Sequence, residues 1–188
     1  MAEVKLYELE ISTVQVTVQG TSPLICHRFS EAAQEQIEGP QQGAAKRGKK
    51  SRDPQAEAEL SLYRNSEGVN CFPAIAFKQA MVRAAKQCDM AMTDARTAFH
   101  VLGDLLPIRG SDPVARADRV VIGRGTTTIA YRPMFDTWEI DLTIRHNARA
   151  ISAEQIINLL EVAGFGVGVG DWRPECSGSF GMFRVARE

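Results

Sequence analysis

The segment GFGVGVGDWRPECSGSFGMF, residues 164–183, combines residue types that can hold a phosphate group and a base. Its first glycines alternate with other residues, and successive backbone N–H groups of such a turn can converge on an anion that no Cβ atom keeps away. Trp172 offers a ring for base stacking, and Arg173 supplies a delocalised cation. The loop therefore predicts a contact site for single-stranded nucleic acid, formed by Gly166, Gly168, Gly170, Trp172 and Arg173.

Two alternatives for this loop remain open. In the first, Gly164 caps the preceding helix and the other glycines only allow close packing. In the second, Trp172 is a core residue. A P-loop or dinucleotide-binding site is disfavoured, because those sites place a helix N-terminus at the phosphate, whereas this loop follows the C-terminus of a predicted helix.

A second candidate contact is the basic run KRGKKSR, which lies in an insertion at about 38–58. The insertion has almost no large apolar side chain, so it is predicted to be mobile. Its cations would neutralise phosphates with a marked salt dependence, and the alternative is a solvated loop without a ligand. These cations are Lys46, Arg47, Lys49, Lys50 and Arg52.

His27 is the only weak candidate for catalysis, because it follows the first predicted strand and adjoins Arg28, a cation that can bind phosphate. We expect His100 to be a partly buried helix residue and His146 to lie at an exposed strand end. The four cysteines are scattered without a CxxC pair, so we expect reduced thiols and neither a metal nor a cofactor.

The composition is nearly neutral, with 22 Lys plus Arg against 23 Asp plus Glu. Any basic site must therefore be local, and this balance also supports the alternative of a structural factor that binds only protein. No apolar run has the roughly 18 residues of a membrane span, and the N-terminus has no apolar signal core, so a cytoplasmic protein is expected. A length of 188 residues favours a single domain, 1–188.

The hydrophobic pattern predicts the elements that position these residues. In order they are a strand at 4–20, the insertion, a helix at 73–87, a short helix at 94–105, a β-ribbon at 118–135, a strand at 137–147, a helix at 152–163 that begins with a Ser152–Gln155 capping box, the glycine loop, and a final strand at 179–188. This βαββαβ order is ferredoxin-like, an α+β fold with both helices on one face of an antiparallel sheet. Lys78 and Arg83 would lie on the free side of the first helix, and Arg124 and Arg132 in the ribbon.

This arrangement resembles the RAMP superfamily of CRISPR-associated proteins, which also has a glycine-rich loop between the last helix and the last strand. The segment CFPAIAFKQAMVRAAK is similar to the start of the first helix in the backbone-subunit branch. The matching residues are Phe72, Pro73, Phe77, Lys78, Ala80, Met81 and Arg83, whereas Ala74, Ile75 and Ala76 replace a Gly and two Ser of the family pattern. The form VGVGDWRP with a final SFGMF also resembles short proteins of tailed phages.

The resemblance implies a protein that binds single-stranded RNA or DNA and assembles head-to-tail with itself into a filament, with the insertion and the ribbon as arms. It also implies other subunits of a nucleoprotein complex as partners, and for a phage protein a role in recombination or strand annealing in the host cytoplasm. Some RAMP proteins cleave RNA, so the main alternative is an endoribonuclease that uses His27. We expect binding without catalysis.

Overall fold

The computed structural model describes residues 9–28, 53–122 and 126–187. The five cations of the basic run and Arg124 lie outside these ranges, as does most of the segment predicted to be a mobile insertion. The predicted mixed α+β class with antiparallel sheets is confirmed.

Five strands form the main sheet, and all of their pairings are antiparallel. They are β1 (Ile11–Gly20), β5 (Phe99–Val101), β7 (Arg109–Gly110), β10 (Trp138–Asn147) and β11 (Phe183–Val185). The strand order is β11-β1-β10-β5, and β7 pairs with the start of β10. The two long strands β1 and β10 therefore occupy the centre of the sheet, as their alternating sequences predict.

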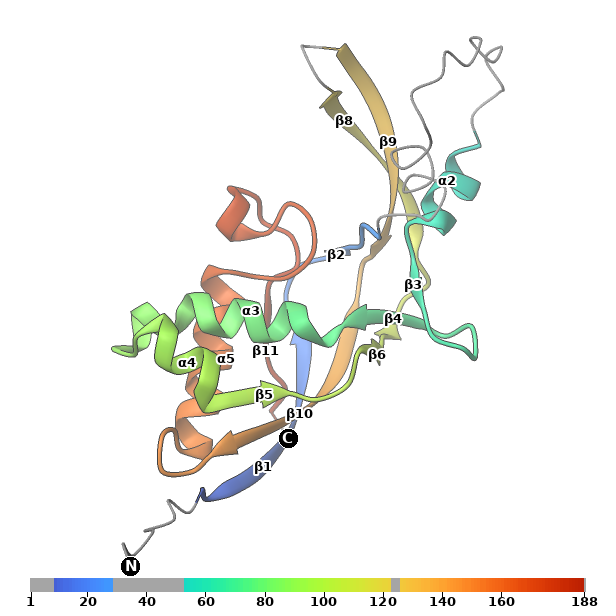
Figure 1. Ribbon diagram of the computed structural model, residues 1–188. Coiled ribbons are helices and arrows are strands. Elements are labelled where there is room, and N and C mark those ends of the chain that lie inside the picture. The colour runs from blue at the N-terminus through green and yellow to red at the C-terminus, as the bar shows by residue number, and fades with distance from the viewer. Residues whose placement is uncertain (1–8, 29–52, 123–125, 188) are drawn as a thin grey trace, which may run out of the picture.

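Two helices cover one face of this sheet (Figure 1). Helix α3 (Ala74–Ala84) lies between β1 and β5 in the chain, and α5 (Ala153–Gly166) lies between β10 and β11. The predicted capping box is confirmed: the Ser152 hydroxyl accepts from the Gln155 N–H, and the Gln155 side chain accepts from the Ser152 N–H. Both helices stay in place because their apolar sides share one core with the sheet.

Alternation along β10 separates a buried face from a polar face. Trp138, Ile140, Leu142, Ile144 and His146 are buried, whereas Asp141 and Arg145 between them are exposed. On the polar face Asp141 accepts from Arg109 and from Thr17, and these contacts lower the pKa of Asp141 to about 2. The helices bury the apolar face, so the described part of the chain leaves the polar face open.

A long hairpin projects away from the main sheet (Figure 1). It consists of β8 (Val114–Ile122) and β9 (Thr126–Phe135), and β2 (Leu24–Ile25) pairs with the base of β9. The remaining elements are α2 (Pro54–Leu60), the small sheet of β3 (Tyr63–Arg64), β4 (Asn70–Pro73) and β6 (Leu105–Pro107), α4 (Met92–Ala98), and the 3₁₀ turns η1 (Ala85–Cys88) and η2 (Pro174–Cys176). Among the described residues, no helix is long and apolar enough to cross a membrane.

Two predicted elements differ from the structure. The short helix predicted at 94–105, with its end near Gly103, ends at Ala98, and Phe99–Val101 is instead β5, which pairs with β10. Three residues are too few to show alternation, so the sequence does not indicate this strand, which is recognised only from its pairing with the edge of β10. The predicted insertion also extends too far, because Asp53 caps α2 through the N–H groups of Gln55 and Ala56.

Candidate nucleic-acid interface

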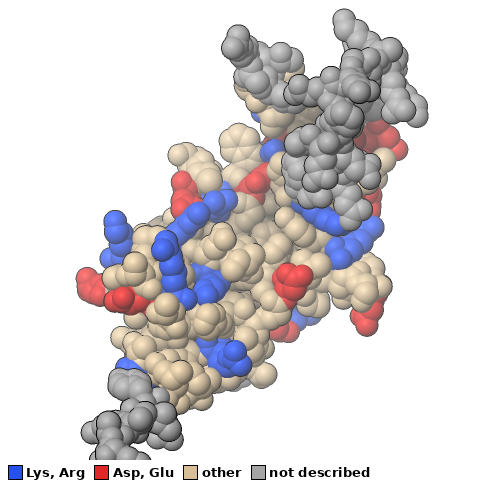
Figure 2. Space-filling model, viewed as in Figure 1, with Lys and Arg blue, Asp and Glu red and all other residues tan. Residues whose placement is uncertain are grey.

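The outer side of α3 carries a basic hollow. Phe77, Ala80 and Met81 face the core, as their spacing predicts, which turns the intervening polar positions outward. Between α3 and α4 this leaves a hollow of about 290 Å³, lined by Ile75, Lys78, Gln79, Val82, Arg83, Met92 and Arg96. Figure 2 shows Lys and Arg side chains gathered over this part of the surface.

A smaller hollow of about 90 Å³ extends from α3 to the glycine loop, and Gln79 and Arg83 line both hollows. Gly168, Gly170 and Arg173 form its other wall. The structure thus brings together five of the residues predicted to contact a strand, from segments about 90 positions apart in the chain: Lys78, Arg83, Gly168, Gly170 and Arg173.

Lys78 and Arg173 already have partners in this interface. Lys78 Nζ lies 3.0 Å from His100 Nδ1. Burial lowers the pKa of His100, and the charges of Lys78 and Arg145 lower it further. Arg173 Nη2 lies 2.9 Å from Glu175 Oε2, and its Nη1 donates to the Gly170 carbonyl at 3.1 Å. Both cations therefore present their charge from a fixed position.

The amides of the glycine loop do not form the predicted anion cradle. Gly168 N–H donates to the Ala163 carbonyl at 2.8 Å, Val169 N–H to Gly181 at 2.9 Å, and Asp171 N–H to Ile25 at 3.0 Å. This part of the prediction is wrong, because the loop uses its donors to join β2 and the segment before β11. What the loop can offer a ligand is the side chains of Trp172 and Arg173.

Close packing accounts for the glycines. Gly168 and Gly170 have φ of +69° and +77°, and a Cβ atom at Gly170 would stand 2.5 Å from the Ile25 carbonyl oxygen. Gly164, predicted to cap α5, lies inside the helix, and Gly166 is the last helical residue. The predicted cap at Gly164 is therefore wrong, and the packing alternative is correct for Gly168 and Gly170, which line the hollow.

Trp172 is not a core residue, since 43% of it is exposed. Its φ is +55°, and its carbonyl accepts from the Phe180 N–H at 3.0 Å. Gly178 makes room for this carbonyl, because a Cβ atom there would overlap it. The turn therefore holds the ring at the surface, where a base could stack on it.

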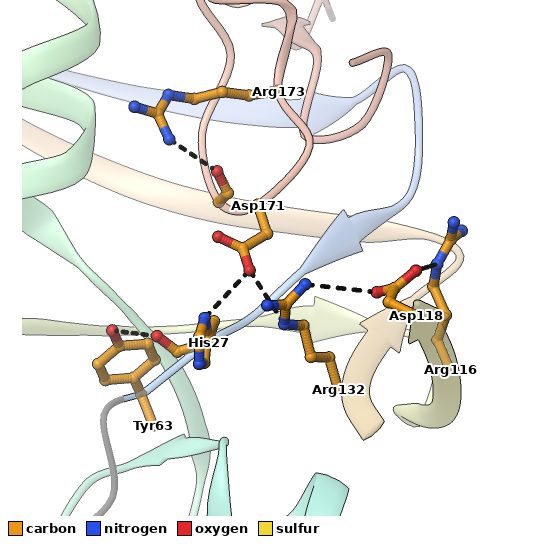
Figure 3. Close-up of polar contacts among 8 residues, drawn as sticks. His27, Tyr63, Arg116, Asp118, Arg132, Asp171 and Arg173 are labelled. Carbon is orange, nitrogen blue, oxygen red and sulfur yellow. Dashed lines mark hydrogen bonds and ion pairs between the residues drawn. The ribbon is translucent and has the colours of Figure 1, made fainter. Parts of the chain in front are cut away.

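His27 belongs to a second polar cluster (Figure 3). Its Nδ1 lies 3.2 Å from Asp171 Oδ2, and Arg132 Nε lies 3.2 Å from the same oxygen without hydrogen-bond geometry. Burial raises the pKa of Asp171, but the hydrogen bond from His27 and the charge of Arg132 outweigh it, so the pKa lies below its ordinary value. Asp171 is therefore an ionised anchor for the imidazole.

Arg132 is an internal cation and not an exposed arm. Its side chain is 12% exposed and also lies 3.6 Å from Asp118 Oδ2, while Arg116 Nε donates to Asp118 Oδ1 at 2.8 Å (Figure 3). Asp118 itself is 5% exposed. The prediction that Arg132 contacts a strand overlooked these carboxylates, which nothing in the local sequence reveals.

Neighbours of His27 add little chemistry. Burial, with a smaller contribution from Asp171, raises the pKa of Cys26 to about 12, so this thiol is not a nucleophile. The Tyr63 hydroxyl donates to the His27 carbonyl at 3.3 Å, and the Arg28 N–H donates to Ser61 at 3.0 Å. Within the described ranges, no three His, Cys, Asp or Glu side chains are arranged to hold a metal ion.

Five charged residues of these clusters were not predicted: Arg96, Arg116, Asp118, Asp171 and Glu175. Arg96 belongs to the short helix that the sequence did indicate, but its place opposite α3 depends on how the two helices pack. Asp171 and Glu175 flank Trp172 and Arg173 in the sequence. Their charge next to predicted cations is the signal that could have identified them as counter-ions.

Neither the models of known families nor the curated proteins include a match to this chain. Among solved structures, the crystal structure of Cmr6 from Pyrococcus furiosus superimposes with a TM-score of 0.49 at 10% sequence identity. The match covers 95% of this chain and 100% of that chain. A likeness at this level defines neither the family nor the activity of the chain.

Proposed function

We propose that the chain binds single-stranded nucleic acid along the outer side of α3. The observation that carries the proposal is the basic hollow, in which Lys78, Arg83 and Arg96 surround an apolar floor that includes Ile75, 56% exposed. Cations beside exposed apolar or aromatic side chains suit a strand whose bases are not hidden in a duplex. The nearly neutral composition requires a local site of this kind.

The strand order supports a more specific proposal. The order β11-β1-β10-β5, with α3 and α5 after the first and third of these strands in the chain, supports the proposal of a ferredoxin-like core. Together with the resemblance of residues 71–86 to RAMP backbone subunits, it leads us to propose a RAMP-like protein. Such a protein assembles with itself along RNA or single-stranded DNA in the cytoplasm, in a CRISPR-related or phage nucleoprotein complex.

Replacing Lys78, Arg83 and Arg96 by Ala together is expected to weaken binding of a labelled single-stranded oligonucleotide roughly tenfold or more. The slope of log affinity against log salt concentration should also fall by about 0.7 for each lost phosphate contact. Fluorescence anisotropy with RNA and with DNA of the same sequence, at several salt concentrations, measures both effects.

The matched control replaces Arg64, Arg149 and Arg187 by Ala. These three exposed arginines lie outside the hollow, so the control changes the net charge by the same amount as the test variant. An equal loss in both triple variants would show that only overall charge matters. A wild-type protein that binds neither RNA nor DNA would contradict the proposal and support the protein-only factor.

If the protein also assembles along the strand, negative-stain images should show particles that lengthen with the oligonucleotide.

A second candidate function is RNA cleavage with His27 as general base. The observation in its favour is the Asp171–His27 pair, because a carboxylate on Nδ1 leaves Nε2 as the acceptor of an imidazole whose side chain is 45% exposed. Nε2 would take the proton of a ribose 2′-hydroxyl, whose oxygen then attacks the neighbouring phosphorus, and the 5′-oxygen leaves with a proton from water, giving a cyclic phosphate and a 5′-hydroxyl. In this cluster the charge of Arg132 is already offset by carboxylates, so Arg132 is a poor candidate for stabilising the negative charge that develops at the phosphate.

On labelled RNA, an active protein should give products of defined length, whereas DNA of the same sequence, without the 2′-hydroxyl, should stay intact. The His27→Ala variant should lose at least about a hundredfold in rate, the usual contribution of a general base. Arg149→Ala is the control, because this exposed arginine lies outside both the hollow and the His27 cluster. RNA that remains intact with the wild-type protein would eliminate this candidate and leave binding as the function.

A further inference from the structure

Two guanidinium groups from distant parts of the chain converge on one carboxylate oxygen. Arg173 directs Nε and Nη2 at Glu175 Oε2 over 3.1 and 2.9 Å. Arg83, on α3, donates its Nη1 to the same oxygen. Three N–H donors thus surround one anionic oxygen, an arrangement that a phosphate oxygen would satisfy equally well.

The surroundings of this oxygen can admit a ligand. Arg83 and Arg173 line the small hollow beside the glycine loop, together with Gln79. The side chains are partly exposed, 40% for Arg83, 26% for Arg173 and 32% for Glu175. The bond from Arg173 Nη1 to the Gly170 carbonyl fixes one guanidinium without using the donors that point at Glu175.

We infer that Arg83 and Arg173 form a phosphate-binding site that Glu175 occupies in the free protein and yields to a phosphate of the bound strand. This inference rests on the proposed function, since the strand must pass along α3. Partly exposed ion pairs contribute little to stability, so a phosphate with further contacts along the hollow can replace the carboxylate. Glu175 therefore sets a threshold that a strand must exceed to bind.

The decisive variant is Glu175→Gln, which keeps the shape of the side chain and removes its charge. With the competing carboxylate neutralised, the labelled oligonucleotide should bind about three- to fivefold more tightly at about 50 mM salt. The matched control is Glu154→Gln, an exposed residue in the first turn of α5 with the same change of net charge. Its gain should stay below roughly twofold because it lies away from the hollow.

A double-mutant cycle tests whether the gain depends on the proposed site. In the Arg83→Ala background, Glu175→Gln should give a clearly smaller gain, because only Arg173 is left for the carboxylate to compete for. Circular dichroism and thermal unfolding of each variant verify the fold. A Glu175→Gln protein that is folded and binds no more tightly than Glu154→Gln would overturn the inference while leaving the proposed function intact.

Inorganic phosphate distinguishes a free anion from a strand as the ligand. If the site serves a strand, phosphate should compete with the oligonucleotide only weakly, and more effectively for Glu175→Gln than for the wild-type protein. Saturable phosphate binding in a protein that binds no oligonucleotide would contradict the proposed function itself. Phosphate that binds without displacing a bound oligonucleotide would overturn the inference alone.

Discussion

Gly164→Ala is expected to lower the free energy of unfolding by about 3 kcal/mol or more, at the upper end of measured overpacking costs. Alanine is the better helix former by about 1 kcal/mol, so propensity alone predicts the opposite sign. A Cβ atom at this position, however, would stand 2.0 Å from the Phe183 carbonyl oxygen and 2.8 Å from its carbonyl carbon. Both of these atoms belong to the backbone of β11, so relief of the overlap requires α5 and β11 to separate.

Gly166→Ala provides the control from the same helix. Its Cβ atom would lie 3.5 Å from the side chain of Gln87, a flexible neighbour at ordinary contact distance. We expect a change within about 0.5 kcal/mol, as for substitutions that meet no buried group. Urea unfolding followed by circular dichroism measures both variants, and equal effects at the two positions would refute the packing argument.

Sequence periodicity succeeded where an element is long and one of its sides is buried. The alternation in β1 and β10 and the apolar stripe of α5 agree with the structure. In α3 the predicted stripe is buried at Phe77, Ala80, Met81 and Ala84, whereas Ile75, expected on the same face, is 56% exposed. The same residues fixed the free side of α3, so Lys78 and Arg83 could be predicted as neighbours on one surface. Local patterns carry this information because each side chain's direction follows from its own backbone.

The histidines show what periodicity could not supply. His146 was expected to be exposed and is 3% exposed, whereas His100 was expected in a helix and lies on a strand. Register decides both: His146 pairs with Phe99 on the buried face, and His100 pairs with Arg145 on the polar face. Because β5 was not predicted, neither pairing could be known.

The glycine loop shows a different limit. Its composition correctly indicated unusual backbone, as the positive φ of Gly168 and Gly170 shows. Whether its amides face a ligand or the protein depends on which carbonyls approach: Gly181 lies further along the same segment, and Ile25 comes from β2, far away in the sequence. The convergence of Arg83 and Arg173 on Glu175 is equally non-local, since α3 and the loop meet only in the fold.

Arg132→Met is the second substitution with a large expected effect, a loss of about 3 kcal/mol in the free energy of unfolding. Asp118 is 5% exposed, and its Oδ2 has no hydrogen bond among the described residues. The charge of Arg132, 3.6 Å away, therefore offsets much of the cost of burying this oxygen. Arg116 still binds Oδ1 in the variant, which keeps the loss toward the lower end of the range for a broken buried pair.

The Asp118→Asn substitution should recover part of this loss in a double variant, because a neutral amide at the same place no longer needs the cation. Arg149→Ala is the exposed counterpart: its ion pair with Glu10 spans 3.7 Å between side chains that are 53% and 65% exposed, and less than about 0.5 kcal/mol should be lost. Equal destabilisation by Arg132→Met and Arg149→Ala would mean that the buried cluster adds no more to stability than an exposed ion pair.

If Arg132 is internal as described, any loss of nucleic-acid binding in Arg132→Met should follow the unfolded fraction of the variant. The loss should disappear at temperatures where the variant is fully folded. A variant that is folded and still fails to bind would instead place Arg132 in the interface.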